Sequence, residues 1–179
     1  MKTLYVNWYG PFTHDEIIKA HGRNEEVVEG QIGPTREDLK GNGLYAFTGK
    51  KKGQRSDACL QYIGITERSF KARFAEPHNH WDINREEKIW LGKVINQEGV
   101  REPLENVESI LVAFCQPPLN SKKLYLPNFE CAVISDFFKK NMEPYKAVGS
   151  IIREIPEIVI WDCAAKKIRY TQKLLSYTP

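Results

Sequence analysis

The sequence predicts an α+β fold with a small, mostly antiparallel β-sheet flanked by helices. Two observations favour this class. Segments with the apolar pattern of strands are too numerous for a helical bundle, and segments with helical spacing lie between them. The chain has 179 residues, of which 41% are hydrophobic and 27% charged, and this is the length and composition of one ordinary globular domain.

The N-terminal segment is expected to contribute one strand and one helix. The stretch TLYVNWYG alternates as a strand does, and Gly10-Pro11 is expected to end that strand with a turn. The next stretch, THDEIIKAHG, has the pattern of a helix in which Thr13 and Glu16 form a capping box.

The rest of the chain is predicted to alternate between strands and helices. The expected strands are residues 44–48, residues 58–65, VESILVAFC at 107–115, and a C-terminal hairpin within EIVIWDCAAKKIRYT at 157–171. The expected helices cover about residues 66–75, residues 84–97, and PNFECAVISDFFKKN at 127–141, the last with Asn128 as its cap.

Composition argues against several classes of protein. The stretch MKTLYVNWYGPF lacks the apolar centre of a signal peptide, and no run approaches the ~18 apolar residues that a membrane span needs. The four cysteines lie far apart and form no CxxC pair, as is typical of reduced thiols. We therefore expect a cytoplasmic protein that does not associate with membranes.

The charge of the chain is unevenly distributed. The net charge is +3, but residues 41–80 alone carry seven Lys/Arg against three Asp/Glu. Residues 1–40 carry five against seven, and residues 81–179 carry fourteen against thirteen. A local basic patch of this kind attracts phosphates, although a solvated lysine-rich turn would explain the same excess.

Two tyrosines stand near glycines on the predicted hairpin. Because side chains alternate along a strand, Tyr45 and Phe47 share one face of the first strand. On the second strand Leu60, Tyr62 and Gly64 share a face. The two tyrosines can then stand side by side, and Gly64 keeps the surface beside Tyr62 clear. An aromatic pair that only stabilises the sheet is the alternative interpretation.

The order of these motifs resembles that of a known nuclease family. Gly43-Leu44-Tyr45 followed by Tyr62-Ile63-Gly64 resembles the paired tripeptides of the GIY-YIG nucleases. FKARF at 70–74 is similar to the family's next helix, which presents an arginine between aromatic residues. ECAVI at 130–134 is similar to a later helix whose glutamate holds a metal ion. These elements imply a GIY-YIG-like core at 41–147, with additions at 1–40 and 148–179.

The resemblance implies a metal-dependent endonuclease that hydrolyses phosphodiester bonds in DNA. It implies Tyr45 as the general base, Arg73 on the phosphate, and Glu130 as the ligand of Mg²⁺, for which Mn²⁺ would substitute. Tyr62 would hydrogen-bond the attacking water or the phosphate, and Ala72 is the alternative register for the arginine position. A free phenol has a pKa near 10, so nearby cations must favour ionisation of Tyr45.

Further side chains are expected to contact the nucleic-acid backbone. They lie in the loop between the paired strands and on or just beyond the following helix, and they are Lys50, Lys51, Lys52, Arg55, Arg68 and His78. Such contacts give affinity and salt dependence without sequence readout. The tripeptide His78-Asn79-His80 spells HNH, but that nuclease motif consists of separated residues, so the tripeptide does not indicate it.

The chain departs from the family pattern at two places. The 16 residues between Tyr45 and Tyr62 exceed the usual spacing, which makes the basic loop an insertion. Family members often carry an asparagine after the glutamate helix, near a proline–tyrosine–asparagine stretch, where this chain has Pro144-Tyr145-Lys146.

Three classes of function therefore stay open. A nuclease could be a restriction enzyme that works as a homodimer on symmetric sites, a mobile-element nuclease or a repair nuclease, with RNA as the alternative substrate. A non-catalytic nucleic-acid-binding module on the same fold is favoured by the missing asparagine. A protein-interaction domain would use the aromatic residues of NWYGPF at 7–12.

Overall fold

The computed structural model describes residues 1–19, 43–76, 82–95, 101–121, 125–141, 143–145 and 154–171. The strands are β1 (Lys2–Phe12), β2 (Gly43–Lys51), β3 (Cys59–Thr66), β4 (Ile83–Val94), β5 (Cys131–Phe138), β6 (Ile158–Asp162) and β7 (Lys167–Thr171). The helices are α1 (His14–Lys19), α3 (Phe70–Phe74) and α4 (Arg101–Cys115). His78, one of the predicted nucleic-acid contacts, lies outside the described residues.

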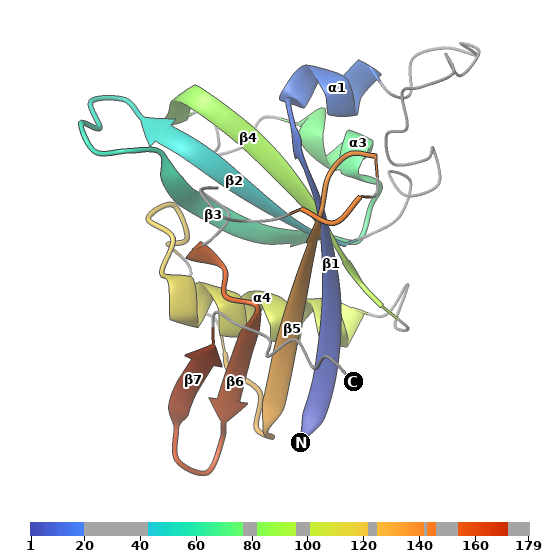
Figure 1. Ribbon diagram of the computed structural model, residues 1–179, viewed down its shortest axis with the longest axis vertical. Helices are drawn as coiled ribbons and strands as arrows, with labels where there is room; N and C mark the ends of the chain where they lie inside the picture. The colour runs from blue at the N-terminus through green and yellow to red at the C-terminus, as the bar shows by residue number, and fades with distance from the viewer. Residues whose placement is uncertain are drawn as a thin grey trace.

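The strands form one seven-stranded sheet in the order β3-β2-β4-β1-β5-β6-β7 (Figure 1). Neighbouring strands pair antiparallel, except that β1 and β5 run parallel. The sheet is strongly twisted, so that β2, β3 and β4 cross the view while β1 and β5 run down it (Figure 1). The predicted α+β class with a mostly antiparallel sheet is therefore confirmed.

The N-terminal strand lies at the centre of this sheet, between β4 and β5. The turn predicted at Gly10-Pro11 is wrong, since β1 continues to Phe12. Its pairing with β4 shifts register between Tyr9 and Phe12, and this irregularity accommodates a proline that cannot donate to the ladder. The predicted capping box is confirmed: the Thr13 backbone N–H donates to Glu16 Oε2 at 2.7 Å, and the Glu16 N–H donates to Thr13 Oγ1 at 3.3 Å.

The segment VESILVAFC is helical, so the strand predicted at 107–115 is wrong. It forms the second half of α4, which begins at Arg101. Leu104, Val107 and Leu111 recur at helical spacing and are buried along one side of α4. A short apolar run such as VESILVAFC does not distinguish a buried strand from a buried helix. The helical period becomes visible only when the preceding residues, from Leu104 on, are included.

The two helices predicted at 84–97 and 127–141 are also wrong. Residues 83–94 form β4 and residues 131–138 form β5. Ile89, Trp90 and Leu91 are consecutive buried residues, as expected for a strand covered on both faces. The hairpin predicted near the C-terminus is confirmed as β6 and β7.

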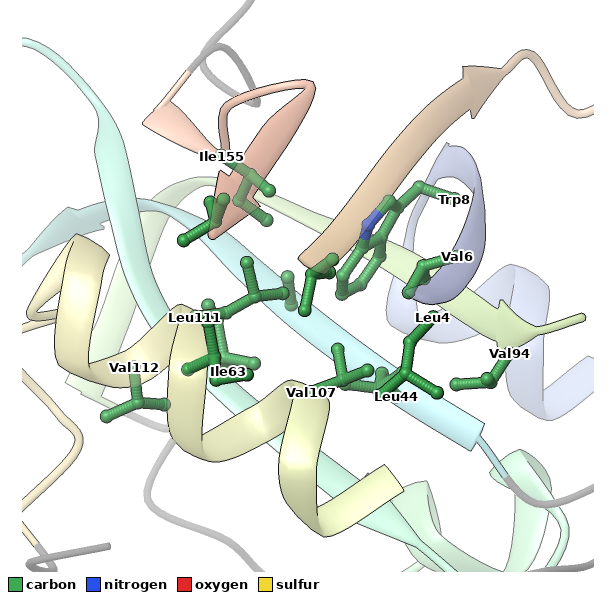
Figure 2. Close-up of a cluster of buried hydrophobic side chains, with 14 of the residues drawn as sticks. Leu4, Val6, Trp8, Leu44, Ile63, Val94, Val107, Leu111, Val112 and Ile155 are labelled. Carbon is green, nitrogen blue, oxygen red and sulfur yellow. The ribbon is translucent and has the colours of Figure 1, made fainter. Parts of the chain in front are cut away.

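Two hydrophobic clusters lie on opposite faces of β2. Leu44 and Ala46 belong to the larger cluster, which α4 covers (Figure 2). Tyr45 and Phe47 belong to the smaller cluster, together with Phe70 of α3 and other residues of α1 and α3. The predicted alternation along this strand is confirmed.

The aromatic residues of NWYGPF contribute mainly to these clusters. Trp8 is fully buried in the larger cluster, Phe12 is buried in the smaller one, and Tyr9 packs partly buried beside it. A surface for partner proteins built on these aromatics is therefore not supported. In the described part of the chain, every helix falls short of the length and apolarity needed to cross a bilayer.

Trp8→Ala tests the central position of β1. Trp8 is 0% exposed, and its Nε1 donates to Ser135 Oγ at 3.3 Å. We expect the substitution to lower the free energy of unfolding by about 3–5 kcal/mol, because it leaves a cavity in the core. Tyr5→Ala on the same strand is the control, since Tyr5 is 48% exposed and should cost less than about 1 kcal/mol. Urea unfolding of both variants would check this, and equal losses would contradict it.

Candidate active site

The β2–β3 hairpin brings the two predicted tyrosines together. Tyr45 pairs with Gly64 and Phe47 pairs with Tyr62 across the antiparallel ladder. The rings of Tyr45 and Tyr62 are stacked, with centroids 5.9 Å apart and planes 26° apart. The predicted neighbourhood of the two tyrosines is therefore confirmed.

Gly64 makes this arrangement possible. A Cβ atom at position 64 would lie 2.6 Å from Cε1 of Tyr62 and 2.7 Å from Cζ and Oη of Tyr45. No side chain fits at these distances, so the two rings approach the backbone of β3 only because residue 64 is glycine.

The prediction that Leu60 shares a face with Tyr62 is wrong, because a β-bulge lies between them. The register shifts so that Phe47 faces Tyr62 but Thr48 faces Leu60, which leaves Gln61 as the extra residue. Leu60 consequently belongs to the larger cluster with Ile63, not to the face of Tyr62. A slip of one residue moves a side chain to the other side of the sheet.

The short helix α3 delivers Arg73 to the tyrosines. Its N-terminus is capped by Ser69, and Phe70 and Phe74 anchor it in the smaller cluster. Arg73 Nε donates to Tyr45 Oη at 2.9 Å, and the guanidinium carbon lies 5.6 Å from the centre of the Tyr45 ring. Arg73, rather than the alternative register at Ala72, is thus the residue that reaches the pair.

Tyr45 is deeply buried, with 2% of its surface exposed. Burial raises the pKa of Tyr45 well above the ordinary phenol value, and the neighbouring Tyr62 raises it further. The hydrogen bond and the charge of Arg73 act in the opposite direction. In this arrangement Tyr45 is a neutral phenol, and added positive charge would favour its ionisation.

The structure does not bring Glu130 to this site. Glu130 is exposed and directly precedes β5. Tyr45 pairs with Leu91, which pairs with Tyr9 on β1. Tyr9 pairs in turn with Phe138. Glu130 is therefore eight residues along the sheet from the level of Tyr45, about 25 Å at ~3.3 Å per residue. The expected helix that was to present this carboxylate does not form.

The loop after α4 covers the outer edge of β3. Asn120 Nδ2 donates to the carbonyl of Ile63 at 2.7 Å, and the N–H of Ile63 donates to Asn120 Oδ1 at 2.9 Å. The backbone N–H of Leu119 donates to the carbonyl of Gln61 at 2.9 Å. Asn120, at the end of the stretch Pro117-Pro118-Leu119-Asn120, therefore pairs with the backbone of the strand that carries Tyr62.

Helix α4 runs antiparallel to β3. At its start, Arg101 Nη1 lies 2.9 Å from Oε2 of Glu67, just beyond the end of β3. At its other end, the Cys115 thiol donates to the carbonyl of Glu154 at 3.4 Å. The carboxylate of Glu154 accepts from the N–H of Leu60, near the start of β3, at 3.0 Å.

These two ends fix the level of Glu108, which is half-buried on α4. Glu108 lies seven residues beyond Arg101, hence on the same flank and about 10 Å along the helix. That distance equals about three residues of β3 counted back from Glu67, which is the level of Gly64. Glu108 is thus a helical carboxylate at the level of Gly64 along β3, although α4 packs on the face of the sheet opposite Tyr45. A helical period read from Leu104 to Leu111 would have placed Glu108 on a helix.

The predicted nucleic-acid contacts differ in their surroundings. Lys52 and Arg55 are exposed at the tip of the β2–β3 hairpin, with Lys51 half-buried beside them. Lys50 Nζ lies 3.0 Å from Oε1 of Glu86. Arg68 donates from both terminal nitrogens to the carboxylate of Glu76, at 2.5 and 2.8 Å. Arg68 is therefore already engaged as a carboxylate partner, whereas the hairpin tip faces solvent.

His14 and Glu87 form a second polar pair, near the end of α3, that was not predicted. His14 Nε2 donates to the carbonyl of Phe74 at 3.0 Å. Glu87 lies near His14, and its Oε1 is buried without a hydrogen-bond partner. Burial raises the pKa of Glu87 above its ordinary value, and the charge of His14 opposes that shift.

Comparison with known proteins finds no matching family model, no matching curated protein and no matching solved structure. Among the described residues, no three His, Cys, Asp or Glu side chains are grouped so that they could hold a metal ion by themselves. The tyrosine pair and Arg73 are the groups that the described structure brings together at this site.

Gly64→Ala tests the close approach of the rings to β3. We expect a loss of about 1–3 kcal/mol in the free energy of unfolding, because the new methyl group displaces both rings. In a double-mutant cycle, Tyr62→Ala should recover part of this loss, since it removes one of the two clashing rings. Urea unfolding of the single and double variants measures both effects, and strict additivity would contradict the proposed clash.

Glu87→Gln tests the burial of that carboxylate. Because the folded state raises the pKa of Glu87, the wild-type protein loses stability as pH rises from the ordinary carboxyl pKa through the raised value. The variant should therefore melt at a higher temperature than wild type at pH 7, and the difference should shrink towards pH 4. Glu86→Gln is the matched control, because Glu86 is exposed and faces Lys50. An equal gain at both pH values would overturn this reasoning.

Proposed function

We propose that the protein is a metal-dependent endonuclease that hydrolyses phosphodiester bonds in DNA. The observation that carries this proposal is the 2.9 Å hydrogen bond from Arg73 Nε to Tyr45 Oη, beside the stacked ring of Tyr62. A phenol and a guanidinium from two separate elements meet at one point. Phosphodiester hydrolysis needs a group of each kind, one for the water and one for the phosphate.

Arg73 is suited to hold the scissile phosphate. Its guanidinium plane is fixed by the bond to Tyr45 and by the aromatic anchors of α3. The terminal nitrogens of an oriented guanidinium match two phosphate oxygens at once. In our proposal Arg73 binds the phosphate and keeps Tyr45 in position, while Tyr62 hydrogen-bonds the attacking water.

Tyr45 takes the proton of the attacking water in this proposal. Burial works against the ionised form of Tyr45, whereas Arg73 works for it. Arg73 alone does not offset burial, so the mechanism requires a further cation close to the phenol. The requirement for metal thus follows from the burial of the proposed base.

Glu108 is the residue that we propose as the metal ligand, in place of Glu130. Mg²⁺ is commonly held by one or two carboxylates together with waters and substrate phosphate, so a single glutamate suits it chemically. A bound Mg²⁺ or Mn²⁺ would supply positive charge to the phosphate oxygens and to the developing oxyanion. Glu108 would hold that cation.

A non-catalytic nucleic-acid-binding module is the second candidate function. The burial of Tyr45 favours it, because a residue that is 2% exposed reaches a water molecule only if its surroundings shift. On this alternative, Arg73 and Tyr62 would hold a phosphate without cleaving it. Both candidates share the nucleic-acid ligand and differ only in the chemical step.

Cleavage of supercoiled plasmid with Mg²⁺, with Mn²⁺ and with chelator distinguishes the two candidates. We expect metal-dependent nicking or linearisation by wild type, and at least about 100-fold slower cleavage by Tyr45→Phe and by Glu108→Gln. Glu130→Gln is the matched control and should cleave at the wild-type rate. The thermal unfolding of each variant shows whether a loss reflects chemistry or folding.

The outcomes lead to different conclusions. Normal cleavage by Glu108→Gln with loss in Glu130→Gln would overturn our assignment of the ligand. Salt-sensitive binding of duplex DNA without any metal-dependent product would favour the binding module.

A further inference from the structure

We propose that the tip of the β2–β3 hairpin, residues 51–57, is a preorganised second contact to duplex DNA, set apart from the cleaved bond. This inference rests on the proposed function for its ligand, since it assumes that nucleic acid binds across the hairpin. In this proposal the basic loop is held in a fixed conformation and binds DNA at a position separate from Tyr45 and Arg73.

Gln54 organises the tip from within. Its Oε1 accepts from the backbone N–H of Lys51 at 3.1 Å, and its backbone N–H donates to the carbonyl of Lys51 at 3.1 Å. Its Nε2 donates to the carbonyl of Asp57 at 2.7 Å and to Ser56 Oγ at 3.1 Å. One side chain therefore holds both sides of the loop, which a merely solvated lysine-rich turn would not need.

Gln61 ties this loop to the sheet. It is 0% exposed and stands at the β-bulge of β3. Its Nε2 donates to Gln54 Oε1 at 3.0 Å and to the carbonyl of Gly49 at 2.9 Å. A buried amide at the base of the hairpin thus fixes the amide that orders its tip.

The neighbouring strand supports the tip from the side. Arg85 of β4 donates from Nη2 to the backbone carbonyl of Gln54 at 2.7 Å, while its side chain remains exposed. Exposed cations at this end include Lys52, Arg55 and Arg85, and exposed carboxylates there include Asp57, Asp82 and Glu86, of which Glu86 pairs with Lys50. A rigid tip binds with a smaller loss of conformational entropy than a flexible lysine-rich loop.

The position of the tip indicates a long, double-stranded ligand. Lys52 lies seven residues along the hairpin from Tyr45, roughly 20 Å away. The hairpin end projects away from α3 and from the body of the sheet (Figure 1). At ~3.4 Å per base pair, the tip would meet the backbone about six base pairs from the cleaved bond. The rigid spacing between two phosphate contacts suits a stiff duplex better than a flexible single strand.

The test measures binding of a fluorescent 30-base-pair DNA duplex to the full chain, with chelator present, over a range of salt concentrations. Replacing Lys52 and Arg55 by Ala should lower the slope of log affinity against log salt by about two, because each of these side chains neutralises one phosphate. The matched control is Lys167→Ala with Arg169→Ala on β7, which removes one lysine and one arginine at the opposite edge of the sheet, where Arg169 Nη2 lies 3.0 Å from Oδ2 of Asp162. Its slope should equal that of wild type.

Gln54→Ala tests the conformation of the tip separately from its charge. It keeps every cation of the tip but removes the hydrogen bonds that fix the loop, so we expect weaker duplex binding with an unchanged net charge. Its melting temperature shows whether the rest of the fold persists, and the Lys52 and Arg55 double variant tests the proposal independently. Wild-type affinity in Gln54→Ala would overturn the claim of preorganisation.

The length and type of the ligand complete the test. Shortening a duplex from 30 to 8 base pairs should weaken wild-type binding more than binding by the Lys52 and Arg55 double variant, which no longer holds the distant part of the duplex. An unchanged salt slope in the double variant would overturn the proposal, as would equal or stronger binding of single-stranded DNA or of duplex RNA. A wild-type protein that binds through the tip but does not cleave would refute the nuclease proposal and leave this inference standing.

Discussion

The contact of two tyrosine rings with the bare backbone at Gly64 is the constraint on which the candidate site depends. Tyr45 lies directly opposite Gly64 on the neighbouring strand, and a side chain at position 64 would occupy the space of both tyrosine rings. Glycine at position 64 lets the ring of Tyr45 lie over β3 and stack on Tyr62. That position places the hydroxyl of Tyr45 within reach of Arg73. A larger residue at position 64 would disturb the ring positions, and with them the hydrogen bond that joins the hairpin to α3.

The alternation of β2 connects this site to the rest of the fold. Leu44 and Ala46 face α4, and Tyr45 and Phe47 face α3, so one strand holds the two helices on opposite sides. Residues on opposite faces of a sheet meet only at its edge. At that edge Asn120 pairs with both backbone groups of Ile63. In our proposal, Glu108 of α4 would act on the tyrosines of the other face from this edge.

The sequence was sufficient where the signals are local. The tyrosine hairpin, the alternation of β2 and the box at Thr13 and Glu16 each depend on a few neighbouring residues, and each is confirmed. Predictions failed where long-range burial decides between helix and strand. Taken by itself, VESILVAFC has the pattern of a strand, but in the structure it continues a helix that starts at Arg101. ECAVI was predicted to be helical, but residues 131–134 pair in parallel with the central strand β1. The expectation that a helix would present Glu130 failed for the same reason, since Glu130 directly precedes β5.

The electrostatics of the two ends of the hairpin indicate different tasks. At the α3 end, one guanidinium is held against a buried phenol, so its charge acts on a single hydroxyl at short range. At the tip, Lys52 and Arg55 are exposed on a loop that Gln54 and Gln61 hold by hydrogen bonds, so their charges would act on an extended partner. Short-range, desolvated charge changes the protonation of a reacting group, whereas exposed charge mainly changes affinity and its salt dependence. The hairpin therefore combines both effects in one rigid element, with about 20 Å of strand between them. If our proposals hold, a stiff ligand that spans this distance would bind to both ends at once, and its position relative to Tyr45 would be fixed before the chemical step.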